Sequence, residues 1–281
     1  MKKFLIQFLD FIGIKETFKR ILLLIRRHFV LNYNKLFNKI VREQDKNYKS
    51  IPILIISFNQ LLYLKQLIDF LKNHNYNNII IIDNNSTYKP LLNYFEEIKT
   101  IVTIHRLEKN YGHLVFWKVK ELFKIYSNGY YVITDADINP IIECPDDFLL
   151  YFKKILDKNF QVTKVGFSLK IDDIPDSNWS KEKIVKWESK FWKKRTKNGN
   201  FIADIDTTFA LYRPKYNLNS TNFMKAIRTD FPYQAKHGGW YIDYKNQTEE
   251  QNFYLLSCNH SSSWRFDADG KLLNDYYIKN L

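Results

Sequence analysis

The stretch Tyr130-Tyr131-Val132-Ile133-Thr134-Asp135-Ala136-Asp137 decides the fold that we expect for this chain. Its first half is a run of β-formers, which is typical of a strand buried on both faces of a sheet. Two carboxylates follow at its carboxyl end, where open α/β sheets bind their ligands. A single small residue separates Asp135 from Asp137, so both side chains can approach one hard cation, Mg²⁺ or Mn²⁺. The tripeptide alone fits a solvated acidic turn better than a cation site, and the neighbouring strands shift the interpretation toward the cation site.

Apolar runs alternate with helical patterns from residue 51 to residue 140. Strands are predicted at 52–59, 79–82 and 101–104, and covering helices at 61–74, 90–99 and 114–126. This alternation predicts an α/β fold with a mostly parallel sheet covered on both sides. Since the carboxyl ends of parallel strands share one edge, the polar residues after three of these strands are expected to meet there: Ser57 and Asn59, Asp83 to Ser86, and Asp135 with Asp137.

The aspartate after the second strand has two interpretations. Asp83 can accept hydrogen bonds from the base or ribose of a nucleotide, and it can equally form a turn or cap a helix. The pattern becomes less regular after Pro140. It predicts a helix capped by Asp146 and ending at Lys158, a strand at 162–170, a helix at 181–195, an interrupted strand at 201–212 and an aromatic tail from Phe231.

Composition excludes several classes of function. The chain has 281 residues and a formal net charge of +13, and its first 50 residues hold 12 Lys or Arg against 4 Asp or Glu. Because the positive charge is concentrated away from the predicted sheet and no base-reading motif is present, we do not expect nucleic acid as a partner. The two cysteines, Cys144 and Cys258, form no Cys-x-x-Cys pair. This argues against a disulfide framework or a zinc site and fits a reducing compartment.

Residues 1–50 are predicted to form a basic amphipathic helical segment with a polar linker at 43–50. Apolar residues recur at spacings of three and four, but the longest uninterrupted apolar run is Ile21–Ile25. That run is too short to span a bilayer or to serve as a signal peptide. The pattern favours helices that lie on an anionic membrane surface. A helical hairpin that packs on the main domain with its charges solvated is the alternative.

Four segments in this order resemble the GT-A-fold glycosyltransferases, in the broad group that includes glycosyltransferase family two. They are Ile53–Asn59, Ile81–Ser86, Asn110–Gly112 and Thr134–Asp137. The resemblance implies a GT-A-like, Rossmann-like sheet flanked by helices over residues 51–281. Within it, residues 51–140 would bind a nucleotide sugar, and residues 141–281 would form the acceptor half and tail. The activity implied is metal-dependent transfer of the sugar to a glycan or lipid-linked acceptor in bacterial surface polysaccharide or lipooligosaccharide synthesis.

The resemblance also implies roles for individual residues. It places Asp83 near the donor base, and Asp135 and Asp137 at the metal and the diphosphate. The further donor-binding candidates are Ser57, Asn59, Asn85, Arg106, Asn110, Gly112 and Ala136. The segment Tyr233–Tyr241 resembles a tail motif of bacterial surface-polysaccharide transferases in which a histidine lies near the donor phosphates. His237 is therefore the third candidate ligand of the Mn²⁺ or Mg²⁺ ion.

The catalytic base and the stereochemistry stay open. The acidic pair that marks the base of inverting members is not clear here, and the candidates are Asp206, Asp204 and Asp230, followed by Glu249 and Glu250. A cytosolic donor and a basic amino-terminal segment imply a cytoplasmic protein, peripheral on the inner face of the membrane. Two rivals remain. A nucleotidyltransferase needs a Gly-rich basic loop after its first strand, which Ser57–Leu62 lacks, and the other rival is a catalytically inactive nucleotide-binding protein.

Overall fold

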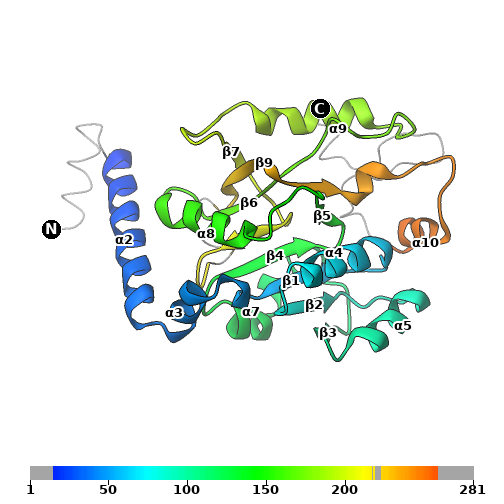
Figure 1. Cartoon of the computed structure of the whole chain (residues 1–281), viewed down its shortest axis with the longest axis horizontal. Coiled ribbons are helices and arrows are strands. Elements are labelled where there is room, and N and C mark those ends of the chain that lie inside the picture. Colours follow the sequence, from blue (N-terminus) through cyan, green and yellow to red (C-terminus); the bar gives the residue numbers. More distant parts are fainter. Residues whose placement is uncertain (1–14, 217, 219–222, 259–281) are drawn as a thin grey trace.

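The computed structural model describes residues 15–216, 218 and 223–258 of the chain. It confirms the predicted α/β class: a central sheet is flanked by helices (Figure 1). Within the described residues the sheet has nine strands, in the order β3-β2-β1-β4-β8-β6-β9-β5, with β7 paired to β9. The strands of the first half lie side by side at one end of this order, and those of the second half complete the sheet.

The first half of the sheet is parallel, as predicted. Strands β1 (Ile53–Ser57), β2 (Ile79–Asp83), β3 (Thr103–Arg106) and β4 (Tyr131–Asp135) alternate with helices α4 (Leu62–Asn73), α5 (Lys89–Ile98), α6 (Val115–Lys118) and α7 (Lys120–Tyr126). Successive residues of β1 pack into two different core clusters, one on each face of the sheet. This two-sided burial explains the unbroken apolar runs. The register pairs Ser57 with Asp83 and Ile56 with Asp135, so the polar residues gather at one edge.

The second half contains most of the antiparallel pairings. Its elements are β5 (Ile138–Pro140), α8 (Phe148–Lys158), β6 (Lys164–Leu169), α9 (Lys181–Ser189), η2 (Lys190–Trp192), β7 (Phe201–Asp204), β8 (Ala210–Tyr212), β9 (Lys225–His237), η3 (Gly238–Tyr241) and α10 (Glu249–Ser257). Strand β8 runs antiparallel to β4 and β6, and β9 runs antiparallel to β5 and β7 but parallel to β6. The long strand β9 therefore links the outer strands to the centre.

Several predicted boundaries in this half are wrong. The N-cap of α8 is Asp147 instead of Asp146, and its side chain makes no capping hydrogen bond. In contrast, the predicted interruption of the strand at 201–212 is confirmed, because β7 ends at Asp204 and β8 begins at Ala210. Strand β9 was not predicted. It runs from Lys225 to His237 and includes the start of the segment that we expected to be an aromatic tail.

Two helices precede the sheet: α2 (Lys15–Phe37) and α3 (Lys39–Lys46), followed by the short helix η1 (Tyr48–Ser50). They confirm the helical prediction over these residues, while the apolar positions before Lys15 lie outside the described part of the chain. The predicted linker at 43–50 is wrong. Gln44 is buried and its side-chain amide bonds both the N–H and the C=O of Tyr130, at the start of β4. None of the described helices is long and apolar enough to cross a membrane.

Candidate active site

A cavity of about 530 Å³ lies beyond the carboxyl ends of β1 and β4. Eight of the residues predicted for the site line it: Asn110, Gly112, Asp135, Ala136, Asp137, Asp204, Asp206 and His237. Ligand sites of open α/β sheets occur at this edge. The structure thus brings residues from both halves of the chain, from Asn110 to His237, around one space.

The carboxylates of this cavity are crowded together. Burial raises the pKa of Asp135 well above its ordinary value, and the nearby charges of Asp137 and Asp206 raise it further. Only the hydroxyl of Thr207, which donates to Oδ2 of Asp135 at 2.7 Å, acts in the opposite direction. Like charges held this close in a buried site disfavour ionisation unless a cation neutralises them. The cluster therefore lacks a positive charge that would neutralise its carboxylates.

His237 reaches this cluster because β5 and β9 pair antiparallel, with Ile138 opposite His237. Its Nδ1 lies 3.3 Å from Oδ2 of Asp137 and has no hydrogen-bond partner, and its ring stacks on Trp240 at 5.0 Å between centroids. The next residue, Gly238, passes beneath the ring of Tyr63, where a Cβ would lie only 2.6 Å from ring atoms. Its N–H donates to the carbonyl of Asp137 at 2.7 Å. Glycine at this position allows the approach that holds His237 beside Asp137.

Two buried cations fix the loop that carries Asp204 and Asp206. The guanidinium of Arg228 donates from Nε and Nη2 to the carbonyl oxygen of Asp204, at 2.9 and 2.7 Å. The ammonium of Lys164 donates to the carbonyl oxygen of Asp206 at 3.1 Å and to the hydroxyl of Tyr212 at 3.0 Å. Burial lowers the pKa of Lys164 to about 7. Because these cations hold main-chain oxygens, both carboxylates remain available to the cavity that they line.

The opposite wall was not predicted as part of the site. Glu188, from α9, forms a buried ion pair with Arg228, and burial raises the pKa of its carboxyl to about 7. Trp187 and Phe191 line the same wall, and the ammonium of Lys190 lies over the Trp187 ring, 2.9 Å from its centroid. The aromatic spacing in the sequence was a visible signal for this wall. Nothing in the sequence around Arg228 pointed to it.

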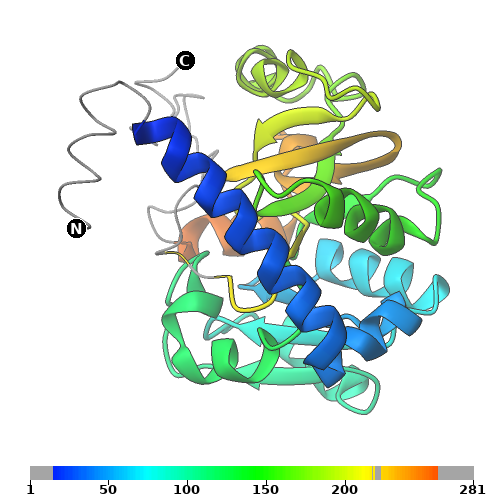
Figure 2. The same cartoon turned by 90° about the vertical axis from the view of Figure 1, so that its left-hand side faces the viewer.

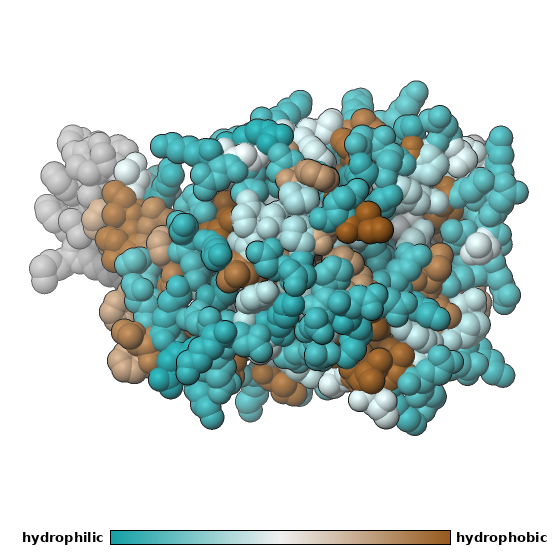
Figure 3. Space-filling view, viewed as in Figure 1, coloured by the Kyte–Doolittle hydropathy of each residue, from teal (hydrophilic) through white to brown (hydrophobic). Residues whose placement is uncertain are grey.

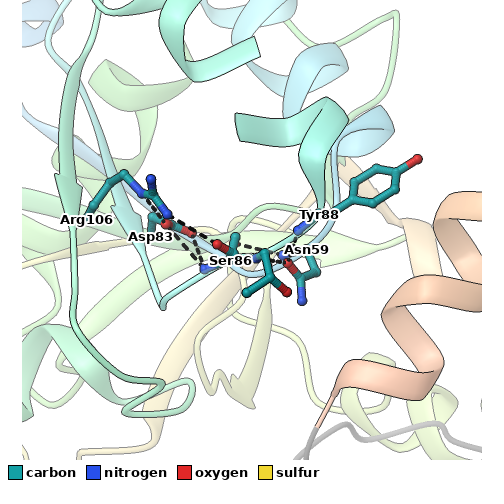
Figure 4. Close-up of polar contacts among 6 residues, drawn as sticks. Asn59, Asp83, Ser86, Tyr88 and Arg106 are labelled. Atoms are coloured by element: carbon teal, nitrogen blue, oxygen red, sulfur yellow. Dashed lines mark hydrogen bonds and ion pairs between the residues drawn. The ribbon is translucent and has the colours of Figure 1, made fainter. Parts of the chain in front are cut away.

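The Asp83 carboxylate lies outside the cavity lining, in a closed network (Figure 4). It is fully buried and accepts hydrogen bonds from Nε of Arg106 at 3.2 Å and from the N–H of Ser86 at 3.2 and 3.3 Å. The side-chain oxygen of Asn59 accepts from the N–H groups of Thr87 and Tyr88, at 2.7 and 3.0 Å. A contact between Asp83 and a ligand therefore requires the half-exposed Arg106 to move aside.

Other predicted residues also lie outside the cavity lining: Ser57, Asn59, Asn85, Arg106 and Asp230. Asn59 and Asn85 have positive φ angles of 50° and 66°, so they shape the two loops that follow β1 and β2. Asp230 forms an ion pair with Arg195 at 2.5 Å. Glu250 caps α4 by accepting from the N–H of Leu61 at 2.9 Å. These contacts give Asp230 and Glu250 structural partners away from the carboxylate cluster.

No protein-family model matches this chain, and no curated protein matches it. Among solved structures, the chain is similar to the mannosyltransferase PcManGT from Pyrobaculum calidifontis in complex with GDP-Man and Mn²⁺, with 10% identity, 83% of this chain and 72% of that chain covered, and a TM-score of 0.45. It is also similar to S. aureus TarS 1–349, with 13% identity, 66% of this chain and 59% of that chain covered, and a TM-score of 0.41. Because these similarities are distant, we infer the chemistry of the cavity from the residues of this chain alone.

The cavity residues fit a divalent cation in part. Across residues 15–216, 218 and 223–258, no three His, Cys, Asp or Glu side chains converge as a ready metal site. Asp137 and His237 nevertheless face each other with the ring nitrogen unpartnered, and Asp135 belongs to the same crowded cluster. Carboxylate oxygens suit Mn²⁺ or Mg²⁺ when a bound phosphate and water complete the shell. An ion here would remove the repulsion within the cluster.

Proposed function

We propose that this protein is a metal-dependent glycosyltransferase that takes a sugar from a nucleotide-sugar donor. The observation that carries the proposal is the crowded cluster of Asp135, Asp137 and Asp206 with the unpartnered His237, on one side of a cavity whose other wall is aromatic. Such a cluster repels a bare diphosphate and accepts one together with a divalent cation. The aromatic wall gives a face on which a sugar ring can lie.

The donor diphosphate is expected to bind beside Asp135 and Asp137, with Asp137 and His237 as the principal ligands of Mn²⁺ or Mg²⁺. When bound, that cation neutralises the charge that develops on the leaving nucleoside diphosphate. The loops of Asn84 and Asn110 close the adjacent side of the cavity, since Nδ2 of Asn84 donates to the carbonyl of Gly112 at 3.2 Å. Asp83 supports this side by ordering its loop, and we keep the base or ribose as its predicted contact.

If the reaction inverts the configuration at the anomeric carbon, a base must take the proton of the acceptor hydroxyl. The hydroxyl oxygen attacks the anomeric carbon, the bond from that carbon to the diphosphate oxygen breaks, and a cavity carboxylate takes the proton. Asp206 is our first candidate and Asp204 our second, because buried cations fix both main chains while both residues line the cavity. Asp230 is a weaker candidate because Arg195 already neutralises it.

The acceptor and the cellular setting remain predictions. We propose a glycan or a lipid-linked glycan as the acceptor, in bacterial surface polysaccharide synthesis at the inner face of the membrane. Support comes from the resemblance of Tyr233–Tyr241 to the tail of such transferases and from the basic amino-terminal helices. Trp187 and Phe191 also line the cavity, and their aromatic faces suit an acceptor sugar.

A donor panel tests the proposal. The purified chain is incubated with a series of nucleoside diphosphate sugars, with Mn²⁺ or with excess chelator, and nucleotide release and melting temperature are measured. We expect one nucleotide to raise the melting temperature only with the cation, because a ligand of the native state stabilises it. Release should fall at least about 100-fold in Asp206→Asn without loss of donor-dependent stabilisation. Stabilisation by no donor, or full release in chelator, would contradict the proposal.

A further inference from the structure

Helix α2 packs on the rest of the protein with its polar side. The guanidinium of Arg27 donates to the carbonyl of Phe160 at 2.5 Å, and the ammonium of Lys35 pairs with Asp157 at 2.8 Å. The residue that follows α2, Asn38, donates from its amide to the carbonyl of Asn128 at 2.7 Å. Leu31 is the one buried residue of this helix. A helix on a globular domain normally turns its apolar side inward, whereas α2 buries only Leu31, half-buries Leu23 and Leu24, and leaves most of its large apolar residues exposed.

Its apolar side faces outward as a continuous stripe. We call this set the outer stripe, and its members recur at spacings of three and four residues: Phe18, Leu22, Ile25, Phe29, Tyr33 and Leu36. Their side chains are between 36% and 69% exposed. Contiguous apolar surface of this kind marks an interaction site, whereas single exposed apolar residues are normal. Both helices, α2 and α3, also pack on the main domain, as the alternative of a packed hairpin predicted, but that packing leaves the outer stripe uncovered.

The outer stripe is accessible to a flat partner. Helix α2 lies at one end of the long axis of the molecule and crosses that end face as a single straight element (Figures 1 and 2). Hydrophobic side chains gather at the same end in the space-filling view (Figure 3). With 23 residues, α2 is about 35 Å long. A planar surface can therefore contact the whole outer stripe at once.

Charge decides what kind of partner this is. The two helices from Lys15 to Lys46 carry nine Lys or Arg and three Asp or Glu. Arg26 is exposed beside Ile25, and it forms no ion pair with another described side chain. A second copy of the chain would bring the same positive helices and the same net charge of +13 to the contact. The charge therefore opposes pairing between two copies and favours an anionic partner.

We propose that the outer stripe docks on the surface of an anionic lipid bilayer, with α2 lying along the membrane plane. The aromatic and aliphatic side chains enter the interface, and basic residues such as Arg26 remain at the level of the lipid phosphates. The surface lies outside the cavity, so this proposal stands whether or not the cavity transfers sugars.

Vesicle binding by point variants tests the docking surface. Truncation is unsuitable because α3 contributes the buried Gln44, so the full chain is used throughout. The stripe variant is Ile25→Asn/Phe29→Asn/Leu36→Asn. Its matched control is Ile101→Asn/Ile142→Asn/Leu256→Asn, which replaces three exposed apolar residues outside α2 and α3. All proteins are sedimented with phosphatidylglycerol–phosphatidylcholine vesicles and with phosphatidylcholine vesicles, and unfolding is followed by circular dichroism.

We expect the wild type and the control variant to bind the anionic vesicles and the stripe variant to partition at least about tenfold less, with unchanged unfolding. Binding should weaken between about 0.1 M and about 1 M salt, since the Debye length shrinks from about 10 Å to about 3 Å. Equal binding by the stripe variant, or equal loss in the control, overturns the proposal. So does a dimer in light scattering that the stripe variant dissociates, which would assign the stripe to a second copy.

Discussion

Strands β2 and β4 flank β1 and each ends in aspartate after a similar apolar run, yet the two carboxylates have opposite surroundings. At the end of β2, Asp83 is fully buried, and it is paired with Arg106 and bonded to the main chain of Ser86. At the end of β4, Asp135 is half-buried; desolvation and the nearby carboxylates raise its pKa, and Thr207 is its hydrogen-bond donor. The first carboxylate is neutralised within the protein and orders a loop. The second has no cationic side chain paired with it among the described residues, which is why we propose that a bound cation neutralises it.

The same sequence signal, an apolar strand that runs into Asp, therefore carries two different functions. What separates them is the partner contributed by another part of the chain: a cationic side chain from β3 for Asp83, and further carboxylates and a histidine from distant segments for Asp135. A mutation that adds or removes such a partner should therefore make the carboxyl end of one strand behave more like the carboxyl end of the other. Below, we call the carboxyl end of β2, at Asp83, the closed end and that of β4, at Asp135, the open end.

The largest effect is expected at the open end, beyond β4. Asp137→Asn removes a carboxylate beside His237, so nucleotide release from the donor should fall by about 100-fold or more. The melting temperature should stay the same or rise, because repulsion with Asp135 is relieved. Asp172→Asn, at a carboxylate whose side chain is 73% exposed, is the matched control. Wild-type release by Asp137→Asn would show that this cluster is no catalytic centre.

At the closed end, at Asp83 of β2, we expect a loss of stability. Asp83→Ala leaves the N–H of Ser86 and the guanidinium of Arg106 without their acceptor, which should cost about 2 kcal/mol of the free energy of unfolding. Urea denaturation measures this change. Arg106→Gln should cost less, since the Arg106 side chain is half exposed. Donor affinity should fall in Asp83→Ala, and an unchanged dissociation constant would limit Asp83 to a structural role.

The pH dependence of stability should reveal the raised pKa of Asp135. The folded protein holds a proton on Asp135 at pH values where the unfolded chain has lost it, because the folded pKa is raised. Stability from this group is thus present below the ordinary carboxyl pKa and is lost as pH rises through the raised value. The slope is about 1.4 kcal/mol per pH unit within that interval. Urea denaturation of the wild type in chelator should show this slope relative to Asp135→Asn, and parallel curves would refute it.

The smallest effect is expected at a third aspartate. Asp230 is partly exposed and paired with Arg195, and an exposed ion pair is worth less than about 1 kcal/mol. Asp230→Asn should therefore leave nucleotide release within about twofold of the wild type and change stability little. A large loss of activity would restore Asp230 as the catalytic base and count against Asp206.

The sequence was most informative where local pattern and tertiary structure agree. Strands β1, β2 and β4 are buried on both faces, so their apolar runs predicted both the strands and the shared edge with Asp83 and Asp135. Parallel pairing then placed the strand ends together without further information. The alternation with α4 and α5 followed from spacing of the kind seen at Leu64, Leu67 and Leu71.

The second half was harder because long-range pairing determines it. Strand β9 is neither uniformly apolar nor regularly alternating, since it pairs with β5, β6 and β7 in turn along its length. The roles of Arg228 and Lys164 depend on main-chain carbonyls of the loop at Asp204 and Asp206, which no spacing in the sequence reveals. His237 was found through a resemblance, whereas its contact with Asp137 depends on the β5–β9 register.

On the proposed function, the position of α3 determines how far from the membrane the acceptor hydroxyl has to lie. Asn38 and Gln44 bond residues at the amino end of β4, whereas Asp135 stands at the carboxyl end of the same strand. Five residues of extended chain span about 17 Å. With α2 on a bilayer, the strand acts as a spacer that holds the reactive carboxylates away from the lipid. If the acceptor is lipid-linked, as proposed, the hydroxyl that reacts must sit some sugars out from its lipid anchor, so the protein would lengthen a glycan already begun.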